Sequence, residues 1–139
     1  MSFELSFSLL ILRLGLAVTF FAHGSQHFLG LFGGRGFKAT ITNWKEKQHI
    51  PIPIGVIGVL TEFFGSLALL LVFLTRPAAL GLTIFMAVAI QKSHWGHGFF
   101  LARREGEGNG IEYGMALLLM CLALLVGGSG AISLDWLLS

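Results

Sequence analysis

Four long apolar stretches dominate the pattern of hydrophobic and polar positions along the chain. They cover residues 5–31, 52–74, 77–95 and 111–127. Their apolar runs are continuous and lack the alternation of a half-buried strand, so each stretch predicts a helix. The first two reach the roughly 20 residues that a helix needs to cross the hydrocarbon core of a bilayer. The last two contain fewer apolar residues, so their polar ends must extend the helices or the bilayer must thin.

The connection between the first two stretches predicts a short amphipathic segment at the membrane surface. Residues 37–47 mix apolar and basic positions and follow a glycine-rich turn at 33–36. Such a segment lies in the interface, where Trp44 is expected at the depth of the lipid headgroups. The pattern therefore predicts four transmembrane helices with a short interfacial segment between the first two.

Composition identifies the bilayer as the solvent of this bundle. Hydrophobic residues make up 55% of the 139 residues and charged residues 12%, against about 25% charged in a typical soluble domain. So few charges cannot cover the large surface of a small soluble protein. The 19 glycines let helix backbones approach closely, as they do in membrane bundles. We therefore expect an all-α membrane protein.

Basic residues gather on one side of the expected bundle and set its orientation. With four crossings, the first and third loops share one side, and the termini share the other side with Arg76. The first and third loops carry Arg35, Lys38, Lys45, Lys47, Lys92, Arg103 and Arg104. Short loops rich in Lys and Arg stay in the cytoplasm, so both termini are expected outside. Because these cations flank apolar runs, the net charge of +2 predicts no nucleic-acid partner.

Ionisable side chains inside the apolar stretches are the candidates for chemistry, because polar groups are expensive in a bilayer. Arg13, His23 and His27 fall within an arc of about 80° on one helix face. Glu62 stands among glycines at spacings of three and four, so it is expected to face the bundle. We expect Arg13 and Glu62 to share one buried polar network, since an unpaired buried charge is strongly unfavourable. The other interpretation is an ion pair that only sets helix register.

The alternation of the spans brings histidines and a carboxylate to one membrane face. His23 and His27 end the first span. His94 and His97 end the third, and Glu112 begins the fourth. An imidazole N–H suits the carbonyl oxygen of a quinone, and a carboxylate can exchange the proton that accompanies its reduction. The sequence therefore predicts a quinone or quinol site at this face.

The predicted site contains residues with two roles. The catalytic residues, which exchange protons, are Glu62, His23 and Glu112. The residues that bind the cofactor are Arg13, His23, His27, His94, Trp95 and His97. The histidines also suit haem b as an alternative ligand, or they are plain interfacial residues. No metal or nucleotide cofactor is predicted, because the chain lacks an H-E-x-x-H pattern and its glycine-rich turn lacks the phosphate-loop spacing.

Several motifs along most of the chain resemble the DoxX family of small membrane proteins. They are LRLGL at 12–16, FFAHGSQH at 20–27, LTEFFG at 60–65, LTRPAA at 74–79, HW at 94–95, GIEY at 110–113 and GAISLD at 130–135. The family usually has lysine at the position of His27. The resemblance implies a four-helix protein of the bacterial or archaeal inner membrane, often associated with redox systems. It also implies a relation to a small subunit of a terminal quinol oxidase and to thiosulfate:quinone oxidoreductase.

Three functional interpretations remain open from the sequence. The first is a redox subunit that binds quinone, acts as an oxidoreductase together with a partner, and receives its electrons from that partner. The second is a non-catalytic accessory or assembly subunit, packed through glycine-rich helix faces against a larger respiratory or photosynthetic complex. The third is a haem-binding protein or a small transporter, in which two similar hairpins form a repeat. The first two imply membership of a larger complex in the bilayer.

Overall fold

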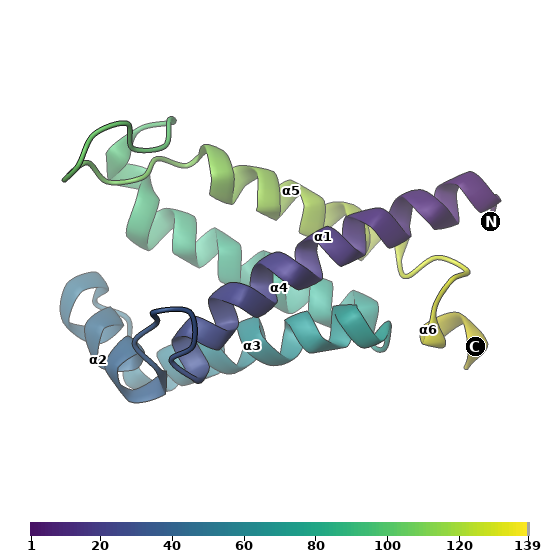
Figure 1. Ribbon diagram of the computed structural model, residues 1–139, viewed down its shortest axis with the longest axis horizontal. Coiled ribbons are helices and arrows are strands. Elements are labelled where there is room, and N and C mark those ends of the chain that lie inside the picture. The colour runs from purple at the N-terminus through teal and green to yellow at the C-terminus, as the bar shows by residue number, and fades with distance from the viewer. Residues whose placement is uncertain (139) are drawn as a thin grey trace.

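The computed structural model describes residues 1–138, which form helices and no strand. Figure 1 shows the long helices lying side by side, with α2 at one end and the C-terminal turn at the other. α4 continues into a π-helical turn, η1 (Ile90–His94), and a 3-10 turn, η2 (Trp95–His97). The helices are α1 (Phe3–Phe28), α2 (Phe37–Gln48), α3 (Ile52–Leu71), α4 (Thr75–Ala89), α5 (Glu112–Gly127) and α6 (Leu134–Leu137).

The all-helical prediction is confirmed, and two helices have the length and composition of membrane spans. These are α1, with 26 residues, and α3, with 20. α5 is apolar but has only 16 residues, and α4 has 15 before its π-helical continuation. The crossing of a bilayer by four helices therefore stays a prediction. The amphipathic segment predicted over 37–47 forms the helix α2.

The turn between α3 and α4 lies earlier than the pattern predicted. Val72 and Leu74 adopt left-handed backbone conformations, with φ of 61° and 54°, and these end α3 before residue 74. α4 then begins at Thr75, two residues ahead of Pro77. The first turn of a helix tolerates proline because its N–H groups have no partner within the helix.

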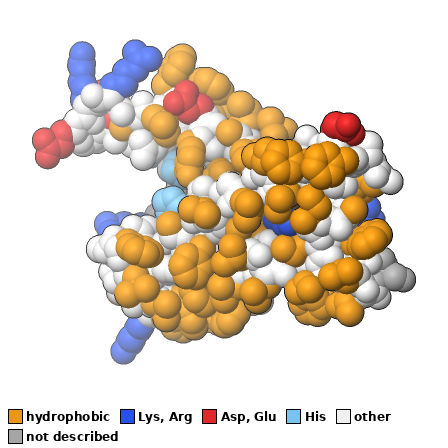
Figure 2. Space-filling view, turned by 45° about the vertical axis from the view of Figure 1, so that its right-hand side comes forward, with side chains coloured by type: hydrophobic (Ala, Val, Ile, Leu, Met, Phe, Trp, Pro, Cys, Tyr) orange, Lys and Arg blue, Asp and Glu red, His pale blue; other side chains and the backbone are white. Residues whose placement is uncertain are grey.

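Apolar side chains fill the space between the helices and also cover their outer faces. The core joins Leu16, Phe20 and Leu82 to Leu117 and Leu124. Outward-facing apolar side chains are exposed on all four long helices. Figure 2 shows large orange patches of such side chains on one face of the molecule. A surface of this kind is costly in water and inexpensive in lipid.

The C-terminal segment, residues 128–138, closes the end of the bundle opposite α2. The fully buried Arg13 donates from Nη1 to the carbonyl of Ser129 (2.5 Å) and from Nη2 to that of Ile132 (3.0 Å). Asp135 accepts the backbone N–H groups of Leu74 (2.7 Å) and Thr75 (2.9 Å). This carboxylate therefore caps the N-terminus of α4.

The predicted network between Arg13 and Glu62 is wrong. Glu62 pairs with His27 instead. Nη1 and Nη2 of Arg13 donate hydrogen bonds to carbonyl groups of the C-terminal segment. The reason is helix register, because Gly24 of α1 packs against the backbone of Phe63. Arg13 lies eleven residues before Gly24, or about 16 Å along α1.

Candidate functional site

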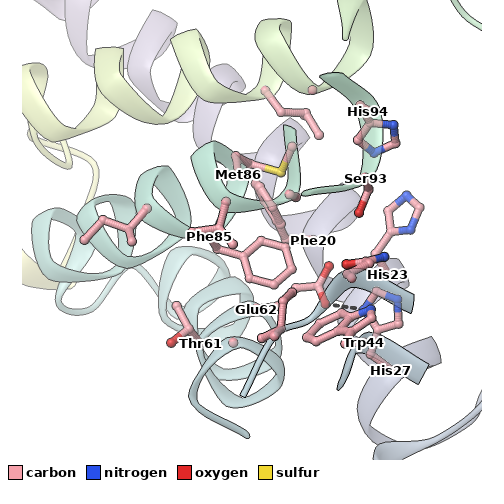
Figure 3. A pocket seen from close by; sticks show the side chains of 18 of the residues that line it. Phe20, His23, His27, Trp44, Thr61, Glu62, Phe85, Met86, Ser93 and His94 are labelled. Atoms are coloured by element: carbon pink, nitrogen blue, oxygen red, sulfur yellow. Dashed lines mark hydrogen bonds and ion pairs between the residues drawn. The ribbon is translucent and has the colours of Figure 1, made fainter. Parts of the chain in front are cut away.

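A cavity of about 520 Å³ lies among the five helices α1–α5, at the end of the bundle that α2 covers. Its walls are mostly apolar and include Phe20, Phe85 and Met86. Figure 3 shows the polar side chains of His23, His27, Glu62, Ser93 and His94 around the same space. A cavity of this size, apolar with a few convergent polar groups, is typical of sites for small molecules.

Glu62 and His27 form the ionisable pair of this cavity. Oε2 of Glu62 lies 2.6 Å from Nδ1 of His27, and the Glu62 side chain is only 3% exposed. Glu62 stands halfway along α3, ten residues after Ile52 and nine before Leu71. A buried carboxylate needs such a partner, because desolvation without one is strongly unfavourable.

Local sequence explains why these two side chains meet. His23 and His27 are one helical turn apart at the end of α1, so they share a face. Gly24 lies between them, and a Cβ there would stand 2.9 Å from Cα of Phe63. The absent side chain therefore lets α1 approach α3 closely enough for His27 to reach Glu62.

Trp44 brings α2 into the site. The sequence had placed this segment only at the membrane surface. Its ring lies edge-on to the His27 imidazole, with 5.2 Å between the centroids, and 6.2 Å from the ring of Phe85. A Cβ on Gly58 would be only 3.4 Å from Trp44. Ile41 and Trp44 are three residues apart on the apolar face of α2, and this spacing is the signal that could have placed Trp44 against α3.

The mouth of the cavity is formed by the π-helical turn η1 and the loop before α5. Ser93 and His94 end that turn, and Nδ1 of His94 lies 2.9 Å from the carbonyl oxygen of Asn109. The carbonyl can only accept, so Nδ1 carries the hydrogen of this bond. Single π-helical turns occur often at functional sites, because they re-aim side chains at the end of a helix.

Four of the predicted site residues lie elsewhere. Arg13 is at the opposite end of the bundle, and the exposed Trp95 does not line the cavity. His97 packs against Gly108 and lines a separate shallow hollow in the loop. Oε1 of Glu112 accepts the backbone N–H of Leu101 (3.3 Å) outside the cavity. The structure thus brings together His23, His27, His94 and Glu62, whose roles stay predictions.

Charged side chains of both signs flank the outer end of the cavity. Figure 2 shows the hollow with histidine inside it and Lys or Arg side chains on both sides. Exposed basic residues at this end include Lys45 and Lys47 of α2 and Arg103 of the loop. Within residues 1–138, no three or more His, Cys, Asp or Glu side chains are grouped closely enough to hold a metal ion.

The fold and the cavity define a class, the small helical membrane proteins with an ionisable pair inside an apolar bundle. Similarity to known sequences then identifies the family. Residues 8–95 match the DoxX family model, and this chain belongs to the DoxX family of membrane proteins. No curated protein and no solved structure matches the chain. The matched residues begin within α1, continue through α4 with the Glu62–His27 pair, and end before α5.

Proposed function

We propose that this chain binds a quinone or quinol in the α1–α5 cavity and serves as a membrane subunit of a redox system. The observation that carries the proposal is the Glu62–His27 pair on the wall of an apolar cavity, in which the Glu62 side chain is only 3% exposed. A buried carboxylate halfway along a helix of membrane-spanning length is expensive, and such groups mark functional sites. Placing it beside an open cavity gives it a ligand to act on.

The lining residues suit both parts of a quinone. A flat apolar ring can lie among the aromatic side chains of Phe20, Trp44 and Phe85. A quinone carbonyl accepts a hydrogen bond from an imidazole N–H, and a quinol hydroxyl donates to a carboxylate or to an unprotonated imidazole nitrogen. His23 and His27 would provide the imidazole contacts, and Glu62 would hold or release the proton that accompanies electron transfer. The electrons come from a partner subunit.

The proposal includes a topology in the inner membrane of a bacterium or archaeon. Four helical segments cross the bilayer: α1, α3, the continuous segment from α4 through η2, and α5. α2 lies on the cytoplasmic surface. The basic loops around the cavity mouth support this orientation, because Lys and Arg are retained in the cytoplasm. Both termini then lie outside, and the cavity opens toward the cytoplasm.

The first experiment is an oxidised and a dithionite-reduced optical spectrum of the protein purified in mild detergent, with organic extraction of the same sample. The proposal expects stoichiometric quinone in the extract and no Soret band. A Soret band that shifts on reduction would make the histidines haem ligands and overturn the proposal. A preparation that contains no quinone and binds none when it is added would also overturn it.

The Glu62→Gln variant tests the pair itself. Glutamine keeps the shape of the side chain but removes the charge, and a hydrogen bond to a charged group contributes about 1.5–3 kcal/mol, so quinone affinity should fall about 10- to 100-fold. Glu46→Gln, on the exposed face of α2, is the matched control and should bind like the unaltered protein. Equal affinities of the two variants, both eluting as folded protein on gel filtration, would remove Glu62 from the site.

A further inference from the structure

The side of the cavity between α3 and α4 carries strongly exposed apolar side chains. Ile54 and Ile57 of α3 line the cavity and are 52% and 60% exposed. Ile84 of α4 also lines it and is 58% exposed. A side chain that faces both the cavity and the outside stands on a rim. We call this rim, made by Ile54, Ile57, Ile84 and Val88, the lateral slot.

Close helix contacts mark where the slot begins. α3 and α4 touch where a Cβ on Gly81 would lie 2.9 Å from Cγ2 of Thr61. They touch again one turn farther along α3, where a Cβ on Gly65 would lie 3.2 Å from Leu82. From Thr61 toward Ile54 the cavity occupies the space between the helices. The slot therefore starts beside Glu62 and runs toward the α2 end of the bundle.

Polarity changes along the path from the slot to the inner end of the cavity. The rim carries only isoleucine and valine, and residues 52–61 and 77–89 contain no ionisable side chain. Next along the path, the rings of Trp44 and Phe85 approach Gly58, where a Cβ would be 3.4 and 3.7 Å from them. The Glu62–His27 pair lies beyond. A ligand that fits this gradient has a polar head and a long apolar tail.

We propose that the lateral slot is the exit for the tail of a polyisoprenyl quinone, whose ring lies beside Glu62 and His27. This inference rests on the proposed function and names its ligand class as a long-tailed, lipid-soluble quinone. A long apolar tail gains little free energy by moving from lipid to isoleucine side chains, because both surroundings are apolar. The slot therefore does not have to bind the tail. The slot must be open, because a closed one would force the tail to fold inside the cavity.

The test compares two ligands on three variants of the full chain. The ligands share one para-benzoquinone ring and carry either a methyl group or a long polyisoprenyl chain. Ile84→Trp and Ile57→Trp each fill the slot from one side. Leu80→Trp is the control, because Leu80 lies one turn before Ile84 on α4, is 47% exposed and does not line the cavity.

We expect both slot variants to lose about tenfold or more in affinity for the long-tailed quinone, since overfilling a packed site costs about 1–3 kcal/mol. Their affinity for the methyl quinone should stay within about twofold of the unaltered protein, and Leu80→Trp should leave both affinities unchanged. Two slot variants on different helices keep the test valid if one of them does not fold.

The outcomes separate this inference from the proposed function. Suppose that the unaltered protein binds both quinones. If the slot variants weaken the binding of both quinones equally, or weaken the binding of neither, the slot is not the tail exit. If the unaltered protein binds only the methyl quinone, the long-tailed ligand class is refuted although a quinone site exists. If it binds neither quinone, the proposed function itself fails.

Discussion

Replacing Gly24 by alanine perturbs the contact that brings α1 to α3. The added Cβ would lie 2.9 Å from Cα and 3.0 Å from N of Phe63, and 3.3 Å from the carbonyl carbon of Glu62. All three atoms belong to the backbone of α3, so no side chain can rotate away. Ordinary contact begins at 3.4 Å, and α1 must therefore move by about 0.5 Å, the difference between 3.4 and 2.9 Å.

Gly15 provides the matched control on the same helix. A Cβ at Gly15 meets no atom within 4 Å, so alanine fits there without any shift. Both substitutions give α1 the same gain in helix propensity, about 1 kcal/mol in water, and this term cancels when the two variants are compared. What remains is the cost of overpacking, about 1–3 kcal/mol. Gly24→Ala should be less stable than Gly15→Ala by that amount.

The assay is equilibrium unfolding of both variants in mixed micelles, followed by circular dichroism and by tryptophan fluorescence. A second readout is quinone affinity, because a shift of α1 moves His27 away from Glu62, which lies only 2.6 Å from it. We therefore expect Gly24→Ala to weaken binding and Gly15→Ala to leave it unchanged. Equal stabilities of the two variants would refute the close approach of α1 to α3 as described here.

Two further predictions concern the C-terminal segment and the orientation. Burial opposes ionisation of Asp135, but the N–H groups of Thr75 and Leu74 and the charge of Arg13 outweigh it and hold its pKa below the ordinary 3.8. An acid whose pKa is lowered by folding stabilises the fold at pH values above its ordinary pKa. This stabilisation is lost as the pH falls through the lowered pKa. Asp135→Ala should therefore lower the thermal midpoint at neutral pH, with a difference that shrinks below about pH 4; a constant difference would contradict this capping role. In a Cys121→Ala background, an impermeant maleimide should label Ser2→Cys on intact cells and Lys47→Cys only after lysis, and the reverse pattern would contradict the proposed orientation.

The sequence predicted those features that depend on local pattern and on the alternation of helices. Continuous apolar runs indicated the long helices, and the ends of successive helices indicated that His23, His27 and His94 would gather at one end. Glycines around Glu62 indicated that this carboxylate faces inward. These inferences succeed because helix periodicity and antiparallel packing act over short distances in the chain.

Partners that depend on long-range register could not be predicted. Arg13 bonds to carbonyl groups of Ser129 and Ile132, which are 116 and 119 residues away and carry no side-chain signal for this role. The backbone carbonyls of any loop are equivalent in sequence, so only the fold selects them. Glu112 begins α5 as expected, but its carboxylate turns to the N–H of Leu101 because the loop folds back over the start of the helix.

The position of Glu62 halfway along α3 has an electrical consequence. In the proposed orientation the cavity gives this carboxyl access to water from the cytoplasmic side only, so a proton that binds there crosses part of the bilayer. Moving one elementary charge across a whole membrane is worth about 2.3 kcal/mol per 100 mV, and a partial crossing is worth the same fraction of that energy. The balance between quinone and quinol at this site would then shift with the membrane voltage, and a charged cell membrane would favour one redox form over the other.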